Sequence, residues 1–438
     1  MKIISSYKIK ILNCSKIFDD TFKIYKKAVS FFINVLDKEW VENNMEELSD
    51  FDKTALMDKL TNRTKQNRDV KYDFKEKFPS FPSNYRSSAL QAAIGSYSSY
   101  FSSLKNWEKE DEETRGQKPT MQSKRNLSPT LYKSMNNVYV RSSFNEARIK
   151  IYYNGVWQWK EFKLKEQNVR NIQKKVGDAK EDSPTLLKQG NRYFLSFPYE
   201  MSTKLETVKV KKQTIASVYL GIDPHATISI MNYKGEILAR HFINYKDLQA
   251  KLVTSCNRIK KCQKHGSIHM PYKWRHVNDI NTEIARRVSK EIVEFASKYN
   301  FNVIVFEHIN KNGKKHSTNK QTLSLWRGRE IQKLVEHKAH ILGKRISTVN
   351  GYNSRYIAFD GTGKFEKPKN NITKFVSGKN YNIALNASYI IGARYFIREL
   401  TKENSKFKNK TKEELEELFG KSSDQTLDTL IKLNKQFK

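Results

Sequence analysis

The chemistry open to this chain depends on three positions in its second half. Asp223 follows the apolar run VYLGI and Glu307 follows the apolar run NVIVF, so each is expected to leave a buried sheet edge. A third carboxylate is expected at the start of the helix that contains ALNASYIIGARYF, where the sequence has Ala384. No Asp or Glu occurs from Lys367 to Arg398. The sequence therefore predicts most of a two-metal phosphodiesterase site, without one of its three acids.

Carboxylates in this arrangement would hold two metal ions about 3.5–4 Å apart for phosphodiester hydrolysis. Mg²⁺ requires near-octahedral oxygen coordination, and a substrate phosphate supplies only part of it. Without the third charge, metal binding weakens and the attacking water is misplaced. We therefore expect Asp223, Glu307 and Ala384 to form a degenerate, inactive triad with no required metal. Residual Mg²⁺ at the two acids is the alternative.

Each surviving acid also has a purely structural explanation. Taken singly, Asp223 or Glu307 is better explained as a strand-end carboxylate bonded to a neighbouring backbone amide, and only the order of the strands reverses that preference. Asn382 and Asn386 stand beside the missing acid, but an amide oxygen brings no charge to a cation. Asp360, in the turn AFDGTG, is the nearest upstream acid that could replace it, although Asp in such a turn usually stabilises its own backbone.

The elements that must position these residues follow from the apolar periodicity of the second half. Residues 216–240 contain three consecutive strands, followed by a basic helical stretch without any acid from Lys251 to Arg275. The remaining pattern predicts, in order, an amphipathic helix at 279–299, the strand NVIVF, a helix at 327–342, the strand RISTVN and a helix at 385–400. This is the order of the ribonuclease H-like fold. The Lys- and Glu-rich tail is expected to be an exposed helical appendage.

The first half has a different pattern. The N-terminus alternates like a strand, residues 21–41 have helical spacing, and Ser83 or Asn84 can cap a second long helix. Beyond it the period becomes two, with a hairpin turn at Asn154-Gly155 and further strands, among them TVKVKKQ. The expected chain is α/β and multidomain. Its parts are a small β-barrel at 1–19 and 135–215, a helical insert at 20–134, a ribonuclease H-like domain at 216–400 and a helical tail at 401–438.

Composition points to a polyanionic partner. Lys and Arg total 81 against 46 Asp and Glu, a formal charge of +35. Nucleic acid is the favoured partner because neutralising phosphates releases counterions and gives strong, salt-dependent affinity. An anionic membrane surface is the competing interpretation. No apolar run of about 18 residues is present, so we expect no membrane span.

Cysteine usage fits a reducing compartment. The chain has only Cys14, Cys256 and Cys262, which excludes a four-cysteine zinc ribbon and argues against a disulfide framework. Cys256 and Cys262 lie six residues apart near two histidines, a spacing that fits no common zinc site. We expect buried thiols, no zinc and a cytoplasmic location.

These motifs resemble TnpB, the RNA-guided nuclease of transposons, and the compact type V CRISPR effectors. The resemblance lies in LGID at Asp223, VFEHI at Glu307, GREIQKLVEHKAHILGKRIS and NASYIIGARYF, and more loosely in FPSNYRSSALQAAIGSYSSYFSSLKNWE. It covers most of residues 1–400. It implies that the barrel is a wedge domain, the insert a recognition domain and the last domain a RuvC nuclease. The implied partners are a guide RNA and double-stranded target DNA with a short flanking motif. The resemblance also implies a bacterial protein that is associated with the nucleoid when bound to its target.

Departures from the family pattern are as informative as the matches. The family has Asp where this chain has Ala384, and it often has Asn where this chain has Ile391. Zinc-ribbon cysteines expected between Asn350 and Ala384 are absent. The segment after Asp223 is also shorter than the family's loop. Together these changes make the chain most similar to the nuclease-dead, TnpB-derived repressors called TldR, with an engineered Asp-to-Ala nuclease as the alternative.

Acid-free stretches suit contact with a nucleic-acid backbone, and a tryptophan beside an arginine can stack on exposed bases. The candidates are Lys260, Lys261, Lys273, Trp274, Arg275, Trp326, Arg327, Arg329 and Lys333, with the loop 311–329 as a whole. Packing explains either tryptophan equally well. By resemblance, the flanking DNA motif is read in the insert and barrel, where the candidates are Lys53, Arg86 and Lys105.

Three functions therefore remain open. The favoured one is an RNA-guided DNA-binding repressor that occupies its target without cutting it, and so is not an enzyme. The second is an active, Mg-dependent RNA-guided endonuclease that recruits Asp360 or a nucleic-acid phosphate. The third is an RNA or DNA binder that uses no guide.

Overall fold

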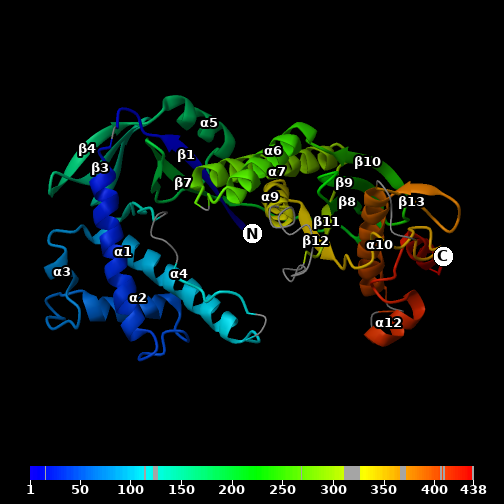
Figure 1. Cartoon of the computed structure of the whole chain (residues 1–438), viewed down its shortest axis with the longest axis horizontal. Coiled ribbons are helices and arrows are strands. Elements are labelled where there is room, and N and C mark those ends of the chain that lie inside the picture. Colours follow the sequence, from blue (N-terminus) through cyan, green and yellow to red (C-terminus); the bar gives the residue numbers. More distant parts are fainter. Residues whose placement is uncertain are drawn as a thin grey trace. The chain divides into compact units, whose positions relative to one another are not determined.

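The structure is a computed structural model of the chain, shown as a cartoon in Figure 1. It describes residues 1–14, 16–112, 115–121, 127–267, 269–309, 326–365, 371–404, 407 and 410–436. The chain divides into two compact units, an N-terminal unit of Lys2–Met201 and a C-terminal unit of Ser202–Lys438 with Met1. The finer domain ranges expected from the sequence stay predictions.

Helices form one part of the N-terminal unit. They are α1 Asp19–Glu39, α2 Asp50–Thr61, α3 Phe74–Lys77 and α4 Ser83–Glu108. α1 and α4 pack on each other through a core rich in aromatic residues. The expected cap of α4 is wrong, because its N-cap is Pro82 and no side chain caps it. Asn84 instead donates to the backbone carbonyls of Tyr132 and Ser134, which ties α4 to the following segment.

Two antiparallel sheets complete the N-terminal unit. One contains β2 Tyr139–Ser143, β3 Glu146–Tyr153 and β4 Val156–Lys163, and the other contains β1 Lys2–Lys10, β5 Lys180–Glu181, β6 Thr185–Gln189 and β7 Arg192–Ser202. Tyr153 pairs with Val156 across Asn154-Gly155, which confirms the predicted hairpin. A single bridge from Ile11 to Leu164 links the sheets, so the barrel stays a prediction. Helix α5 Glu166–Val176 was not expected.

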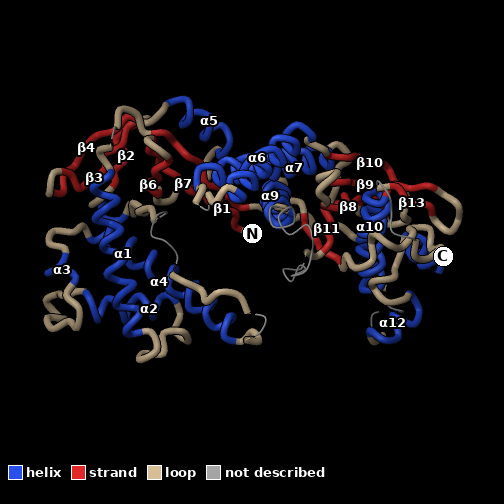
Figure 2. Tube along the Cα trace, in the orientation of Figure 1, coloured by secondary structure: helices blue, strands red, loops and turns tan. Residues whose placement is uncertain are grey.

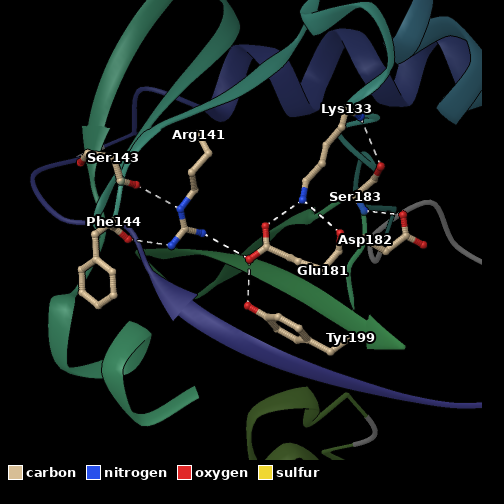
Figure 3. A network of polar contacts seen from close by, with 8 residues as sticks. All are labelled: Lys133, Arg141, Ser143, Phe144, Glu181, Asp182, Ser183 and Tyr199. Carbon is tan, nitrogen blue, oxygen red and sulfur yellow. Dashed lines mark hydrogen bonds and ion pairs between the residues drawn. The ribbon is translucent and has the colours of Figure 1, made fainter. Parts of the chain in front are cut away.

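A carboxylate on β5 holds parts of the N-terminal unit together (Figure 3). Glu181 accepts hydrogen bonds from Lys133 Nζ at 2.7 Å, from the Tyr199 hydroxyl at 2.8 Å and from Arg141 at 3.5 Å. Burial and the bond to Glu181 raise the pKa of Tyr199, so its hydroxyl stays a donor. Lys133 and Arg141 are thus structural cations rather than free charges for a polyanion.

A five-stranded sheet in the order β10-β9-β8-β11-β12 is the centre of the C-terminal unit. The strands are β8 Thr214–Leu220, β9 Ala226–Asn232, β10 Ile237–Ile243, β11 Val303–Glu307 and β12 Arg345–Val349. β9 is antiparallel to both β8 and β10, whereas β11 is parallel to β8 and β12. The order of strands and helices along the chain is the one predicted from the sequence, whereas the pairing of β11 with β8 and β12 was not predicted.

Helices cover both faces of this sheet (Figure 2). They are α6 Lys246–Lys264, α7 Pro271–Ser297 and α9 Gly328–Ile341 on one face and α10 Ile383–Glu403 on the other. Successive residues of β8 alternate between the two cores, Val218 in the first and Tyr219 in the second. The buried runs in β8 and β11 are apolar because both of their faces are covered.

A buried hydroxyl network fixes α10 on the sheet. Ser217 of β8 donates to the Ser388 carbonyl at 2.7 Å, and its hydroxyl lies 2.8 Å from that of Ser229 on β9. Ser229 donates in turn to the Ser388 hydroxyl at 3.0 Å. Gly392 allows this close approach, because a Cβ there would lie 3.0 Å from the Ser217 hydroxyl. The start of α10 is therefore held at a defined place beside β8.

Two further expectations about the C-terminal unit are wrong. TVKVKKQ is not a strand, since it ends in a 3-10 turn at Val210–Lys212 whose Val210 is buried against α10. The tail is not an exposed appendage either. After α12 Lys412–Phe419, helix α13 Leu427–Gln436 packs on α10 and buries Leu430 and Leu433 completely. The apolar spacing of α13 was visible in the sequence but was outweighed by the surrounding charge.

A small aromatic core lies in the region where zinc-ribbon cysteines were expected. It surrounds the hairpin of β13 Ile372–Lys374 and β14 Asn380–Asn382. The rings of Phe365 and Phe375 stack at 5.4 Å, and Phe359 contacts both Phe375 and Tyr381. Ring packing can therefore stabilise this segment without a metal ion.

The docking of α13 predicts a difference between two adjacent positions. Leu430→Ala should lower the free energy of unfolding of the C-terminal unit by about 2–4 kcal/mol, because it leaves a cavity in a packed core. Ile431→Ala, at a side chain 39% exposed, should cost less than about 1 kcal/mol. Urea denaturation measures both, and equal losses would show that α13 is not docked.

Candidate nucleic-acid interface

One cavity of the C-terminal unit brings together all three positions that the sequence singled out. Its volume is about 490 Å³, and Asp223, Glu307 and Ala384 all line it. The cavity lies where β8 and β11 end and α10 begins. We refer to it as the acidic-site cavity. The three positions that the sequence singled out therefore line a single cavity.

Asp223 lies beyond the end of its strand rather than on it. β8 ends at Leu220, and Asp223 is exposed in the loop that follows. Asn244 donates to its carboxylate at 2.6 Å, and Asn371 donates to its backbone carbonyl at 3.1 Å. The two amides hold the loop in place and leave the carboxylate exposed.

Glu307 is in a very different environment at the end of β11. Burial raises the pKa of its carboxyl to about 7, against the opposing attraction of Arg355 and Arg394. Gly351 makes this burial sterically feasible, because a Cβ there would lie 2.6 Å from Glu307 Oε2. At neutral pH, Glu307 therefore carries only part of a negative charge in the metal-free protein.

The third position presents no acid. Ala384 is in the first turn of α10, whose N-cap Asn382 accepts a hydrogen bond from the Leu385 backbone. The first turn contains no acidic residue. The N-terminus of a helix carries partial positive charge, which an aspartate at this position would balance. With alanine there, the helix end adds positive rather than negative potential to the cavity.

Arg355 is a cavity residue that the sequence analysis missed. It lines the cavity, and its guanidinium lies 5.8 Å from the centroid of the Tyr219 ring. No motif pointed to it, because it is placed by an irregular loop after β12. A guanidinium in this cavity opposes binding of a cation and favours an oxyanion.

The residues present do not fit a pair of resident metal ions. Among the described residues, no group of three or more His, Cys, Asp or Glu side chains could hold a metal. The proposed replacement acid is engaged elsewhere, since Asp360 accepts bonds from the Thr362 backbone and hydroxyl and from the Ser377 hydroxyl. It stabilises its own turn, as the alternative reading held.

A basic surface at the junction of α6 and α7 contains several predicted contacts. Lys260, Lys261, Lys273 and Arg275 are exposed there, as is Lys333 on α9. Lys273 donates to Cys262 at 2.7 Å. Cys256 is buried as expected, but Cys262 is only half-buried, so the prediction of a second buried thiol is wrong. Within the described part of the chain, no helix has the length and apolarity needed to cross a bilayer. This surface remains our predicted contact for a phosphate backbone.

The other predicted nucleic-acid contacts of the C-terminal unit have packing or hydrogen-bonding roles within the protein. Trp326 donates from Nε1 to the Gly221 carbonyl, and Trp274 packs against the core under α6 and α7. Arg327 bonds Glu330 and Asn278, and Arg329 donates to the Ile309 carbonyl. Because these interactions fix the side chains, only their exposed atoms are free to stack on a base or contact a phosphate. Residues 310–325 of the predicted loop lie outside the described residues.

Two candidates of the N-terminal unit need correction. Arg86 is buried, donates to Asp58 and Thr61 and lies over the Phe32 ring, so it is a core residue rather than a DNA contact. Lys53 is also buried, with Nζ 5.5 Å from the Trp40 ring centroid. Lys105 is half-buried and paired with Glu46, and of these three candidates it alone keeps a partly accessible position. Burial beneath neighbouring aromatic rings was not visible in the sequence.

A family model and a curated relative each match part of the chain. The Aq_aa04 family model matches residues 5–153, within the N-terminal unit. The uncharacterized protein aq_aa04 of Aquifex aeolicus (strain VF5) is 29% identical over 149 residues, which are 30% of this chain and 83% of that protein. These matches assign no activity.

Fold comparison extends over most of the chain. The Cas12f1 chain in a complex with sgRNA and target DNA matches at TM-score 0.55 and 15% identity, over 85% of this chain and 82% of that chain. CasPhi-2 (Cas12j), bound to crRNA and phosphorothioate-DNA, matches at TM-score 0.47 and 10% identity, over 88% and 91%. The Cas12f1 likeness shows that this chain shares the mixed α/β, multidomain fold of a compact Cas12 protein.

The burial of Glu307 predicts a pH-dependent stability in metal-free buffer. Glutamate titrates near pH 4.3 when unfolded, so the higher pKa in the folded protein makes stability fall as pH rises from about 4.5 through about 7. The free energy of unfolding of Glu307→Gln should therefore exceed that of the parent protein by on the order of 2 kcal/mol at pH 8 and by little at pH 4.5. Denaturation at both pH values measures this, with exposed Glu336→Gln as the control. A gain that does not depend on pH would contradict the burial of a charged carboxyl.

Proposed function

We propose that this chain is an RNA-guided DNA-binding protein that occupies its target without cleaving it and so represses transcription. The observation that carries the proposal is the make-up of the acidic-site cavity. Ala384 stands where a third carboxylate is needed, and Arg355 lines the space that metal ions would use. The proposal includes a degenerate RuvC domain in the C-terminal unit and no requirement for Mg²⁺ in binding.

Charge and fold together support nucleic acid as the partner. The formal charge of +35 needs a polyanion to offset its self-repulsion, and exposed lysines gather at the α6–α7 junction. The Cas12f1 chain of similar fold is described in complex with sgRNA and target DNA. In such guided recognition, base pairing reads the sequence while the protein holds the backbone. We therefore include a guide RNA and a target duplex with a short flanking motif in the proposal.

The electrostatics of the cavity favour binding over hydrolysis. Two-metal hydrolysis needs enough negative charge to hold both cations. Here Asp223 is the single exposed carboxylate, Glu307 is only partly charged near neutral pH, and Arg355 adds a positive charge. The start of α10 adds further positive potential. A backbone phosphate can therefore enter the cavity directly, held by Arg355 without a bridging metal.

The test of the function uses the full chain with the RNA that co-purifies with it. Sequencing that RNA identifies the guide and the matching DNA. The complex should bind this duplex and leave it intact in Mg²⁺ or Mn²⁺, at the level of the Glu307→Gln variant. Efficient cutting that Glu307→Gln abolishes would establish the endonuclease alternative. A protein that binds without any defined RNA would establish the unguided alternative.

Replacement of Arg355 tests the phosphate contact separately. Arg355→Gln should weaken DNA binding about 5- to 10-fold, and it should reduce the slope of log K against log salt by about 0.9, the value for one phosphate. Arg355→Lys keeps the charge and should retain the parent slope. Fluorescence anisotropy over a salt series gives both quantities. An unchanged slope in Arg355→Gln would rule out this contact.

A further inference from the structure

A second, smaller cavity adjoins the acidic-site cavity in the C-terminal unit. It has a volume of about 120 Å³, and we refer to it as the side cavity. Helices α6 and α7 form most of its walls, which are largely apolar and include Leu252, Cys256, Ile284 and Ala285. The two cavities share Gly221, Ile222 and Trp326 in their linings. A strand whose phosphate lies in one cavity therefore has the other within reach of its base.

The side cavity contains an unused hydrogen-bond donor. His225 lines it and is only 5% exposed. Its Nδ1 accepts from the Tyr245 backbone N–H at 3.4 Å, so the ring proton is on Nε2. That Nε2 makes no hydrogen bond of good geometry among the described residues, although the side chains of Gln249 and Asn244 lie close enough to interact with the ring. A buried donor without a partner is costly, and an acceptor atom on a ligand would relieve the cost.

Trp326 forms a fixed wall between the two cavities. Its indole Nε1 donates to the Gly221 carbonyl at 2.9 Å. The ring lies so close to Gly328 that a Cβ there would be 2.5 Å from it. An indole fixed in this way is a preformed surface on which a planar ring can stack without ordering a side chain.

Size and charge restrict what can occupy the side cavity. An apolar cavity of about 150 Å³ holds one benzene molecule. The side cavity, at about 120 Å³, therefore admits at most one six-membered ring. Lys260 also lines the cavity and favours a ring attached to an anion, whereas the charge of Arg327 is paired with Glu330. A pyrimidine base meets each requirement, because it has a planar ring, acceptor oxygens for His225 and a neighbouring phosphate.

We propose that the side cavity receives one unstacked pyrimidine base of a bound DNA strand whose phosphate lies in the acidic-site cavity. This inference rests on the proposed DNA-binding function. Lys260 and the apolar walls of α6 and α7 hold the nucleotide, Trp326 stacks on the base and His225 donates to its carbonyl oxygen. The contact adds affinity at one position of the strand. Base pairing to a guide would not provide this affinity.

An abasic scan of the target tests the proposal with the complete RNA-bound protein. Each pyrimidine of either DNA strand is replaced in turn by an abasic site, and the Kd of each duplex is measured. The abasic replacement at one position should weaken binding about tenfold, which is the loss expected when one stacked base is removed. Cys256→Leu, which fills the side cavity, should weaken the intact duplex by the same factor and abolish the sensitivity of that position. Cys14→Leu, the same change in the N-terminal unit, should behave like the parent.

Free thymidine separates a failure of the cavity from a failure of the proposed function. Saturation-transfer NMR with the protein alone should detect thymidine, and Cys256→Leu or His225→Leu should remove the signal while Cys14→Leu retains it. His225→Leu keeps the test valid if Cys256→Leu does not fold. Thymidine binding in a protein without guided DNA binding would support the cavity and overturn the function. Tight DNA binding with no sensitive position and no thymidine signal would overturn the cavity.

Discussion

The close packing of α10 against the central sheet is the constraint on which the C-terminal unit depends. Gly392 lets the helix approach β8, and the hydroxyls of Ser217, Ser229 and Ser388 satisfy one another where the two meet. Because this contact fixes the start of α10, residue 384 lines the same cavity as the acids after β8 and β11. The identity of one side chain, rather than a change of fold, then determines whether a third carboxylate is present.

Charge, more than shape, separates binding from cleavage in this scaffold. The strand order β10-β9-β8-β11-β12 brings the site positions together, but burial leaves Glu307 with a pKa of about 7 and Arg355 adds a cation. A cavity with these groups attracts a phosphate more readily than a pair of divalent ions. The fold that Cas12f1 shares therefore need not carry the same chemistry in this chain.

Sequence periodicity predicted the parts of the fold that depend on local pattern. The buried strands that lead to Asp223 and Glu307, and the helix that begins beside Ala384, were all located, because apolar runs record burial directly. Side chains that take their environment from distant segments were not. The sequence suggested that Arg86 is a surface cation, whereas in the structure it packs on the rings of Phe32 and Phe74. Arg355 belongs to no recognisable motif, because an irregular loop brings it to the cavity. The many charged residues around α13 likewise led us to overlook the regular spacing of its leucines.

Metal binding by the protein alone tests the central claim most directly. Ala384→Asp places a carboxylate in the first turn of α10, where the helix dipole favours it. Titration with Mn²⁺, followed by electron paramagnetic resonance in metal-free buffer, should show two ions bound by this variant at sub-millimolar concentration and no such pair in the parent. If the parent protein binds the pair as tightly as Ala384→Asp, the cavity has enough negative charge for catalysis and the account is wrong.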